Sequence, residues 1–293
     1  MPENVIAYST FWFDSGCGES YISAAKNEPI DAVLKRVHTA SIYFLMNEKT
    51  AIELVEICHR LATQGFVTAT DGNVSARLTD GGFLTTRTGV NKGMVTLSDL
   101  VEVDGNGKPR DPKLSPSTEF GMHLFIYHKR PDVAAVVHAH PIHATGFAAA
   151  GLALDRCIFP EVIVGLGAIP LASYATPSTP EVAESISPFV KTANAILLAN
   201  HGVVTYGPDL WDAYFKMEKV EHAAHIEFVA RLLGGQRPLT SDQLEKLRTI
   251  SPESYGKDFT DKPQCRTEER SEERIPADDD ILNLVRQMIR KSS

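Results

Sequence analysis

The sequence predicts an α/β fold, and three features of its apolar pattern indicate this class. Short β-like runs separated by Gly-containing turns fill residues 66–103. Two apolar runs follow at 133–140 and 195–205, and segments with helical spacing lie between and after them. With 293 residues, of which 43% are hydrophobic, the chain can bury a substantial core. We therefore expect one α/β domain with additional segments at both ends.

Composition narrows the class of protein. A net charge of −8 at pH 7 disfavours a nucleic-acid backbone as the partner. The sequence has no apolar run of bilayer length and does not begin with the pattern of a secretory leader. Its four cysteines lie far apart without CxxC spacing, which favours free thiols over a disulfide framework. These features predict a soluble, cytoplasmic protein with neither a nucleic-acid nor a membrane partner.

The first half of the domain combines helices with a group of strands. Apolar residues at helical spacing predict a helix over 51–64, which the next glycine would end. The runs FVTAT, VSARL, GFLTT and LVEVD have strand character, and DGN, DGG and DGNG turns punctuate them. A second helix is expected in SPSTEFGMHLFIYHKRP, with Ser115 as its N-cap, Pro116 at its first position and Pro131 just beyond its end.

The second half continues the alternation of strands and helices. The run VAAVVHAH is a predicted strand, AILLANHGVVT is a further apolar run, and an amphipathic segment spans 181–190 between them. An apolar stripe predicts a long helix over 209–233, which ends at a Gly-Gly pair. Residues 256–280 are charged, and the last segment has helical spacing. We predict an N-terminal extension (1–48), a catalytic domain (49–250) and a charged tail with a terminal amphipathic helix (251–293).

Three histidines fall within the stretch VVHAHPIHATG (136–146). Because strand side chains alternate, His138 and His140 lie on the same face and can both reach one small cation. His201 is the best candidate for a third ligand, since it follows an apolar run and precedes a glycine that permits close backbone approach. Three nitrogen ligands without a thiolate are typical of catalytic zinc, although Co²⁺, Mn²⁺ or Fe²⁺ also fit. We expect His143 to make local hydrogen bonds.

The segment PSTEFGMH places a carboxylate beside a predicted anion site. Glu119 would lie in the first turn of a helix, where free N–H groups and the helix dipole favour an anion such as phosphate. Polar groups at this helix start and in the segments DGNVS and TTRTG offer further phosphate contacts. These groups belong to Asn73, Ser75, Thr88, Gly89, Ser117 and Thr118. Each feature alone also fits an ordinary turn or helix start.

Several of these segments, in this order and at these intervals, resemble the class II aldolase/adducin family. They are GNVS (72–75), TRTG (86–89), PSTE (116–119), VVHAH (136–140), YAT (174–176) and NHG (200–202). The resemblance runs from Ala51 to Leu233. It implies a three-layer α/β/α fold around a largely antiparallel sheet, whereas alternating strands and helices alone suggest a parallel one. It also implies a homotetramer with active sites at subunit interfaces.

The resemblance assigns a role to each candidate residue. His138, His140 and His201 match the family's zinc-binding histidines, and Glu119 matches its catalytic acid/base. The matches to the phosphate-binding loops are Asn73, Thr88, Gly89, Ser117 and Thr118. The sequence departs from the family at Arg87, where a proline is expected. It also lacks a clear match to a tyrosine that assists catalysis, a region occupied by Phe159, Pro160 and Glu161.

These roles predict a zinc-dependent aldolase. It would reversibly cleave a ketose 1-phosphate of the fuculose-1-phosphate type into dihydroxyacetone phosphate and an aldehyde. Zinc would stabilise the developing enediolate, while Glu119 moves the proton at the adjacent carbon. A sugar-phosphate dehydratase or decarboxylase on the same metal site is the alternative. A metal-free, adducin-like interaction module is a weaker one, because the three histidines and the glutamate are all present.

Overall fold

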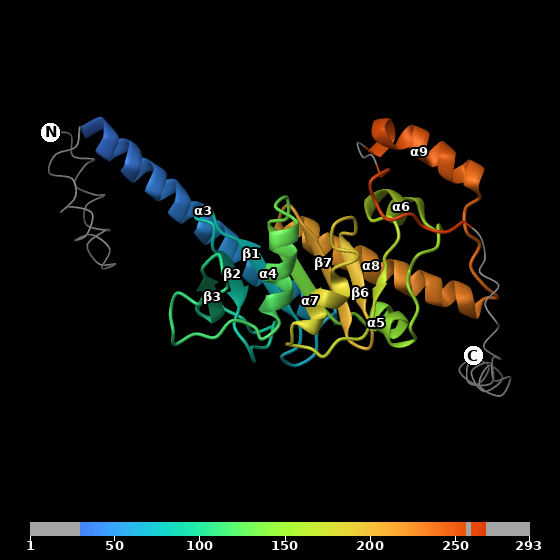
Figure 1. Ribbon diagram of the computed structural model, residues 1–293, viewed down its shortest axis with the longest axis horizontal. Coiled ribbons are helices and arrows are strands. Elements are labelled where there is room, and N and C mark those ends of the chain that lie inside the picture. Colours follow the sequence, from blue (N-terminus) through green and yellow to red (C-terminus); the bar gives the residue numbers. More distant parts are fainter. Residues whose placement is uncertain (1–29, 256–258, 268–293) are drawn as a thin grey trace.

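A central sheet with helices on both faces makes up the described part of the chain, which is residues 30–255 and 259–267 of a computed structural model (Figure 1). The sheet has seven strands in the order β3-β2-β1-β4-β7-β6-β5. They are β1 (Asn73–Arg77), β2 (Phe83–Thr86), β3 (Leu100–Val103), β4 (Ala135–Ala139), β5 (Leu171–Ala172), β6 (Ala195–Leu198) and β7 (Gly202–Gly207). Every neighbouring pair is antiparallel except β5 and β6. The predicted α/β fold with a largely antiparallel sheet is confirmed.

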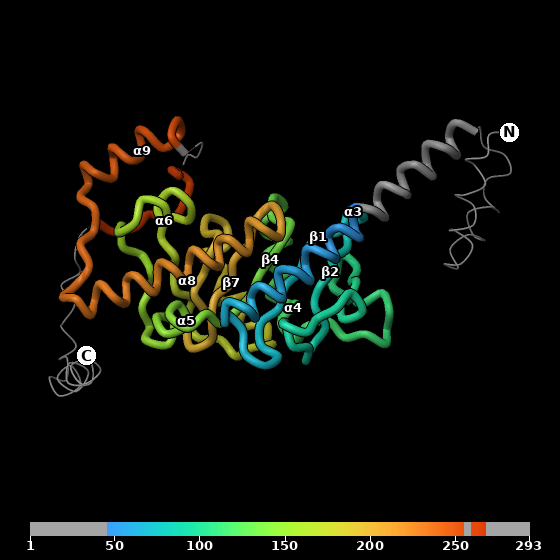
Figure 2. Tube along the Cα trace, turned by 180° about the vertical axis from the view of Figure 1, so that it is seen from behind, coloured from blue at the N-terminus to red at the C-terminus, as the bar shows by residue number. Residues whose placement is uncertain are grey.

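Two groups of helices cover the two faces of the sheet (Figures 1 and 2). One face packs against α3 (Ile30–Thr63), α5 (Ile142–Ala149) and α8 (Leu210–Leu232), and the other against α4 (Phe120–Lys129) and α7 (Glu181–Ile186). The remaining described helices are η3 (Leu97–Asp99), α6 (Pro160–Gly165) and α9 (Ser241–Tyr255). The arrangement is the three-layer α/β/α architecture.

Strand β4 shows why the central runs are apolar at every position. All five of its residues are buried. Successive side chains point to opposite faces, so Val136 packs in the layer of α4 and Val137 in the layer of α3 and α8. A strand covered on both faces needs no polar alternation. This explains how VAAVVHAH can be a strand without the hydrophobic-polar pattern of an exposed sheet.

Three predicted elements have different bounds in the structure. The helix predicted over 51–64 begins at Ile30. The run FVTAT is not a strand, because the chain turns through residues 66–70 before β1. The helix predicted from Ser115 begins only at Phe120. Its expected first turn instead pairs with the end of β2: Ser117 N donates to Thr86 O (3.0 Å), and Thr88 N donates to Ser115 O (3.1 Å). Extended pairing with the strand therefore outweighs the cap-like sequence.

The long helix predicted over 209–233 is confirmed as α8. Asp209 is its N-cap, and its side chain accepts a hydrogen bond from Asp212 N at 2.7 Å. Buried residues recur along one stripe of the helix, among them Tyr214, Met217 and Val220. The chain leaves the helix through a glycine pair with positive φ, as the sequence indicates. The strand predictions for VSARL, GFLTT and LVEVD are confirmed as β1, β2 and β3.

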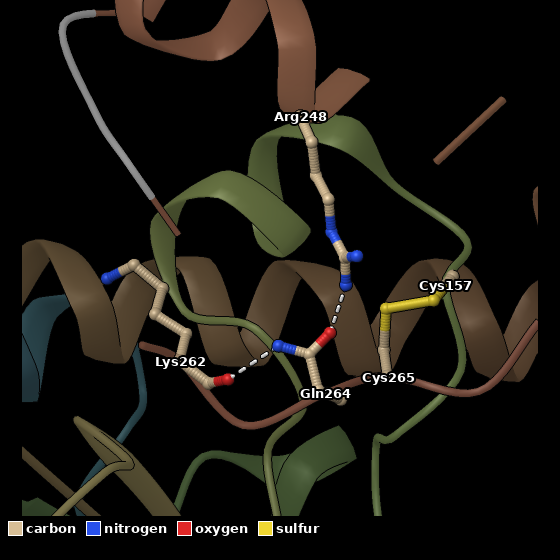
Figure 3. Close-up of a disulfide and its surroundings, with 5 residues drawn as sticks. All are labelled: Cys157, Arg248, Lys262, Gln264 and Cys265. Carbon is tan, nitrogen blue, oxygen red and sulfur yellow. Dashed lines mark hydrogen bonds between the residues drawn. A yellow bond between two sulfur atoms is a disulfide. The ribbon is translucent and has the colours of Figure 1, made fainter. Parts of the chain in front are cut away.

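The prediction of free thiols is wrong for two of the four cysteines. Cys157 and Cys265 form a disulfide across 108 residues of sequence (Figure 3). It belongs to a small core separate from the main one, made of Cys157, Ile163, Val164, Leu244, Leu247 and Phe259. Spacing along the chain cannot reveal this pair, because folding brings the loop before α6 and the segment after α9 together. Cys58 is a buried thiol, and its burial raises its pKa to about 12.

Several predicted segments lie outside the described residues. These are the arm at 1–28, most of the charged stretch 256–280 and the predicted terminal helix. Helix α3 runs without a break through the predicted domain boundary after residue 48. Among the described residues, none of the helices combines the length and apolar character that crossing a membrane requires.

Candidate functional site

The three predicted metal ligands meet at one end of strands β4 and β7. His138 lies in β4, His140 follows the end of that strand, and His201 lies in the turn between β6 and β7. Each offers one ring nitrogen, and these three nitrogens all lie within 4.8 Å of one another. Among the described residues this is the one group of metal-binding side chains that meets this condition. The sequence pattern therefore predicted a real cluster.

The rings are arranged around a shared point. Their centroids are 4.9 Å apart for His138 and His140, 4.7 Å for His138 and His201, and 5.1 Å for His140 and His201. The Nε2 atoms of His138 and His140 are 3.1 Å apart. Three neutral imidazoles are suitable ligands for zinc and related divalent ions. The donor set fits a metal with an open coordination position.

Backbone contacts determine which nitrogen of His138 is available. Its Nδ1 lies 2.9 Å from Val203 O, and because a carbonyl only accepts, Nδ1 must carry the proton. That leaves the lone pair on Nε2, which faces the cluster. Burial lowers the pKa of His138 to about 3, so the ring is neutral at pH 7. Burial also lowers the pKa of His140. Both rings are therefore in the protonation state that a metal requires.

The turn that carries His201 is tight. Asn200 adopts a left-handed φ of 56°, which asparagine tolerates better than most residues. At Gly202 an added Cβ would lie 2.5 Å from His140 Cδ2 and 2.7 Å from Ala139 O. Only glycine leaves room for β4 and its histidine at this position. The predicted close approach is confirmed.

Glu119 lies directly against the histidine cluster. Its Oε1 is 3.1 Å from His201 Nε2, and its Oε2 is 3.4 Å from His138 Nε2. Asn73 Nδ2 donates to Oε2 at 2.9 Å. Burial alone would raise the pKa of Glu119, but His138 and the hydrogen bonds from His201 and Asn73 outweigh it and hold the pKa below its usual value. The carboxylate is thus ionised and positioned at the candidate metal centre.

The position of Glu119 follows from how α4 begins. The residue is the N-cap of the helix rather than part of its first turn. Its backbone N–H donates to Ser117 Oγ at 3.3 Å. On the neighbouring strand, the register places Asn73 opposite His138. Strand pairing and the helix start therefore bring the amide, the carboxylate and the imidazole into contact.

The predicted phosphate-binding groups divide into two sets. Thr88, Gly89 and Thr118 are exposed, and Ser117 is half-buried beside them. The Thr118 hydroxyl accepts a hydrogen bond from Ser178 Oγ at 2.8 Å. Asn73, by contrast, is buried, and its side-chain nitrogen is bonded to Glu119. Its Oδ1 has no hydrogen-bond partner among the described residues.

Ser75 does not fit the predicted phosphate contact. It is fully buried, and its hydroxyl lies 2.7 Å from His123 Nδ1 and 2.8 Å from Tyr127 OH. Because side chains alternate along β1, Asn73 and Ser75 lie on the same face of the strand. Asn73 lies near the start of α4, and Ser75 lies further along that helix. Burial lowers the pKa of His123 to about 4, so this ring stays neutral. Ser75 is part of a buried polar network behind Glu119.

Two residues near the site were not found by sequence reasoning. Lys92 is almost fully buried, and its Nζ donates to Thr70 O (2.9 Å) and Val90 O (2.7 Å). It thereby links the segment before Asn73 to the segment after Gly89, and burial lowers its pKa. The other is Asp71, whose Oδ2 lies 3.7 Å from His140 Nδ1. Lys92 lies in no predicted motif, and Asp71 begins the segment DGNVS without having been assigned a role, because the contacts of both residues depend on how their loops fold.

His143 forms hydrogen bonds, as predicted, but with a residue distant in the sequence. Its Nδ1 lies 2.7 Å from Glu221 Oε1, and its ring stacks on His225 with centroids 3.9 Å apart. The same carboxylate accepts from His143 N (3.1 Å) and Ala144 N (2.9 Å). Glu221 of α8 therefore caps the N-terminus of α5, immediately after the ligand strand. This contact fixes the chain where it leaves the histidine cluster.

With this geometry established, comparison with known proteins defines the class. The Class II Aldolase and Adducin N-terminal domain matches residues 52–228. The chain belongs to the class II aldolase/adducin family. The matched region contains Glu119 and all three histidines, and it excludes the end of α8, α9 and the segment 259–267.

Individual relatives agree with this assignment. The L-fuculose phosphate aldolase of Haemophilus influenzae is 35% identical over 204 residues, which are 70% of this chain and 94% of the relative. An Escherichia coli protein, 5-methylthioribulose-1-phosphate/5-deoxyribulose-1-phosphate aldolase, is 32% identical over 187 residues, 59% of this chain and 87% of the relative. A solved structure of L-fuculose 1-phosphate aldolase matches with a TM-score of 0.63 and 29% identity, covering 68% of this chain and 94% of that one.

Proposed function

We propose that the protein is a metal-dependent aldolase. It reversibly cleaves a ketose 1-phosphate of the fuculose-1-phosphate type to dihydroxyacetone phosphate and an aldehyde. The observation that carries this proposal is the contact of the Glu119 carboxylate with two of the three clustered histidines, at 3.1 Å and 3.4 Å. An acid/base group beside a metal site suits the breaking of a C–C bond next to a carbonyl. The aldolases among its relatives support the same reaction.

His138, His140 and His201 would hold the metal ion. Zn²⁺ is the proposed ion, and Co²⁺ or Mn²⁺ suit the same three nitrogens. When bound, the ion supplies positive charge that stabilises negative charge developing on the substrate's oxygens. The protein's own contribution is to keep the rings neutral by burial and to orient His138 through Val203 O.

Glu119 moves the proton in this proposal. Its pKa is held below its usual value, so the group starts as a carboxylate and can accept the proton. Asn73 fixes Oε2 by donating to it, which leaves Oε1 as the oxygen nearer to His201. The buried network of Ser75, His123 and Tyr127 joins α4 to strand β1 and limits how far the helix start can move.

The substrate phosphate is proposed to bind at the loops around the start of α4. Thr88, Gly89, Ser117 and Thr118 present polar groups at the surface there, and Asn73 lies beneath them. Lys92 holds two of these loops together and adds a positive charge. Ser75 is left out of this set because it is buried.

The same residues suit two related reactions. A dehydratase or a decarboxylase of sugar phosphates needs the same metal ligands and a glutamate at the same position, so both stay as the alternative. An adducin-like module without metal is the weaker alternative, since the metal-binding cluster is intact. We also propose assembly into a homotetramer, which exposed apolar side chains on α8, such as Phe215 and Phe228, support.

A cytoplasmic location also stays a proposal. One observation that suggested it, the prediction of free thiols, is wrong for Cys157 and Cys265 because they form a disulfide, and disulfides are rare in the cytoplasm. The division into extension, domain and tail likewise stays a prediction.

Glu119→Gln tests the proposed function most directly. The zinc-loaded protein is assayed against a panel of ketose 1-phosphates, with dihydroxyacetone phosphate as the readout. We expect the wild type to cleave at least one, and the variant to lose activity by about 10²–10⁴-fold while keeping its metal content. A variant as active as the wild type would refute the role of Glu119. Absence of cleavage across the panel would favour the dehydratase or decarboxylase.

A further inference from the structure

The two histidines at the end of β4 differ in what lies beyond each ring. A histidine that binds a metal through one ring nitrogen normally donates the N–H of its other nitrogen to an acceptor. For His138 this acceptor is Val203 O, 2.9 Å from Nδ1. His140 also turns its Nε2 toward the cluster, 3.1 Å from His138 Nε2, so its proton belongs on Nδ1. Among the described residues, no backbone carbonyl accepts a hydrogen bond from that nitrogen.

The Asp71 carboxylate lies on the outer side of the His140 ring. Its Oδ2 is 3.7 Å from His140 Nδ1, a charge contact that is slightly longer than a hydrogen bond. No other carboxylate of the described residues makes such a contact with this ring. Because half of the Asp71 side chain is exposed, a small rotation is enough to bring the carboxylate within hydrogen-bond distance.

Other aspartates in the tight turns of this chain use their carboxylates differently. In such turns an aspartate oxygen accepts a hydrogen bond from the backbone N–H two residues further on. The pairs are Asp80 Oδ1 with Gly82 N (3.0 Å), Asp104 Oδ1 with Asn106 N (2.9 Å) and Asp111 Oδ1 with Lys113 N (2.9 Å). Asp71 begins the DGN turn in the same way, but its carboxylate accepts no backbone hydrogen bond from the described residues and faces His140 instead.

The loop that carries Asp71 is packed directly on the ligand strand. Phe66 O accepts a hydrogen bond from His140 N at 2.8 Å. At Gly72 an added Cβ would lie 2.8 Å from His138 O, so the backbone there approaches the other ligand closely. Residues on both sides of Asp71 therefore contact the two histidines, and this limits how far the carboxylate can move away.

A strained turn and a buried lysine fix the conformation of this loop. Ala69 has a left-handed φ of 49°, which is unfavourable for a residue other than glycine. Asp71 N donates to Thr68 O at 2.9 Å and closes the turn, while Lys92 Nζ donates to Thr70 O at 2.9 Å. Strain of this kind persists only where surrounding contacts enforce it, and it is concentrated at functional sites.

We propose that Asp71 is a positioning residue of the metal site. Its carboxylate accepts the Nδ1–H of His140 and so holds the ring in the tautomer whose Nε2 binds the metal. A carboxylate in this place also makes the ring a stronger ligand. The inference rests on the metal site of the proposed function, and it does not depend on which reaction that site catalyses.

The tautomer of His140 is the first readout, and nitrogen-15 NMR of the metal-free full chain measures it. In the wild type we expect the Nδ1–H form to predominate. In Asp71→Ala the ratio should shift about tenfold toward the Nε2–H form, because one hydrogen bond to a charged group is lost. A residue that only shapes the loop would not change this ratio. An equal ratio in the two proteins would overturn the proposal.

Zinc affinity is the second readout, and competition with a chromophoric chelator measures it. Asp71→Ala should bind zinc about 10–100-fold more weakly than the wild type. Asp71→Asn keeps a neutral acceptor of the same shape, so it should show a smaller loss of the same sign. Asp132→Ala is the matched control, because it removes the same charge just before β4 begins, at the opposite end of the strand from His140. It should change neither readout.

The outcomes separate this inference from the proposed function. A wild type that binds no zinc would overturn the metal site and this inference together. A wild type that binds zinc, with equal affinity in Asp71→Ala, would overturn the role of Asp71 alone. If Asp71→Ala does not fold, Asp71→Asn decides, and wild-type values for both of its readouts would refute the role.

Discussion

The metal centre and the disulfide region are stabilised in different ways. The metal centre lies at the end of a sheet in which every neighbour is paired, and the register alone places Asn73 opposite His138. The disulfide region has α6, α9 and the segment 259–267 packed around a core of six buried residues. No strand of the sheet runs through it. A covalent link joins its two halves instead.

This difference shows where a local pattern is enough to position side chains. At the metal centre, strand alternation and one tight turn fix three histidines that are up to 63 residues apart in sequence, from His138 to His201. In the disulfide region, a small core buries little apolar area, and small cores are weak stabilisers. The crosslink compensates by restricting the unfolded chain.

Removing the disulfide should have the largest effect on stability and a small effect on the metal centre. For Cys265→Ser we expect a loss of about 2–5 kcal/mol in the free energy of unfolding, since the bond closes a loop of more than 100 residues. Zinc content should not change, because the histidines lie on the sheet. Thermal unfolding and metal analysis would measure the two quantities.

A reductant provides the control for this variant. Reduction should destabilise the wild type and leave Cys265→Ser unaffected, since Cys58 is buried and already a thiol. Loss of zinc together with stability in Cys265→Ser would show that the two regions are coupled, contrary to this comparison.

The same contrast explains what the sequence could predict. The histidine cluster was found because alternation and a glycine are local signals, and Glu119 was singled out because the sequence around it has the pattern of a helix start. The start of α4 was misplaced, because pairing of Ser117 with Thr86 is a contact between segments 31 residues apart. Lys92 and the disulfide were missed for the same reason. Their partners are determined by tertiary packing, which spacing does not encode.

Ser75 was misassigned for a related reason. A residue two positions from Asn73 shares its strand face, but the sequence does not show how deep each one lies beneath α4. In the structure, His123 and Tyr127 take up the Ser75 hydroxyl. A polar residue in a motif can therefore form hydrogen bonds inside the protein instead of contacting the ligand.

His123 should make the stability of the metal-centre region depend on pH. Burial lowers its pKa to about 4 in the folded protein, against about 6.5 in an unfolded chain. Between these values the unfolded state binds more protons, so stability rises with pH. The contribution is complete above about pH 6.5 and is lost as the pH falls toward 4, to a total of about 3 kcal/mol.

The difference between wild type and His123→Gln isolates this contribution. Both metal-free proteins are unfolded with denaturant at pH 4.5 to 7.5, a range set by these pKa values. The contributions of the other histidines cancel in the difference, because both proteins contain them. We expect the wild type to lose more stability than the variant as the pH falls. Parallel curves for the two proteins would show that His123 does not titrate in this way.

Gly202→Ala should have the smallest effect on stability but a specific effect on the metal centre. The added Cβ would meet His140 Cδ2 at 2.5 Å and Ala139 O at 2.7 Å, so the ring or β4 must shift. Strain of this kind costs about 1–3 kcal/mol. Displacing a ligand by a few tenths of an ångström should weaken zinc binding by about 10–100-fold, the range found when the support of a ligand is removed.

Gly146→Ala is the matched control, because a Cβ there meets nothing within 4 Å and the position lies in helix α5. It should keep full zinc affinity and gain a little stability, since alanine is the better helix former. Competition with a chromophoric chelator measures both affinities. Equal affinity in Gly202→Ala and the wild type would mean that the turn does not position His140. The register of β4 would then be sufficient to position His140. The difference between the two regions would in that case come from the sheet and not from the turn.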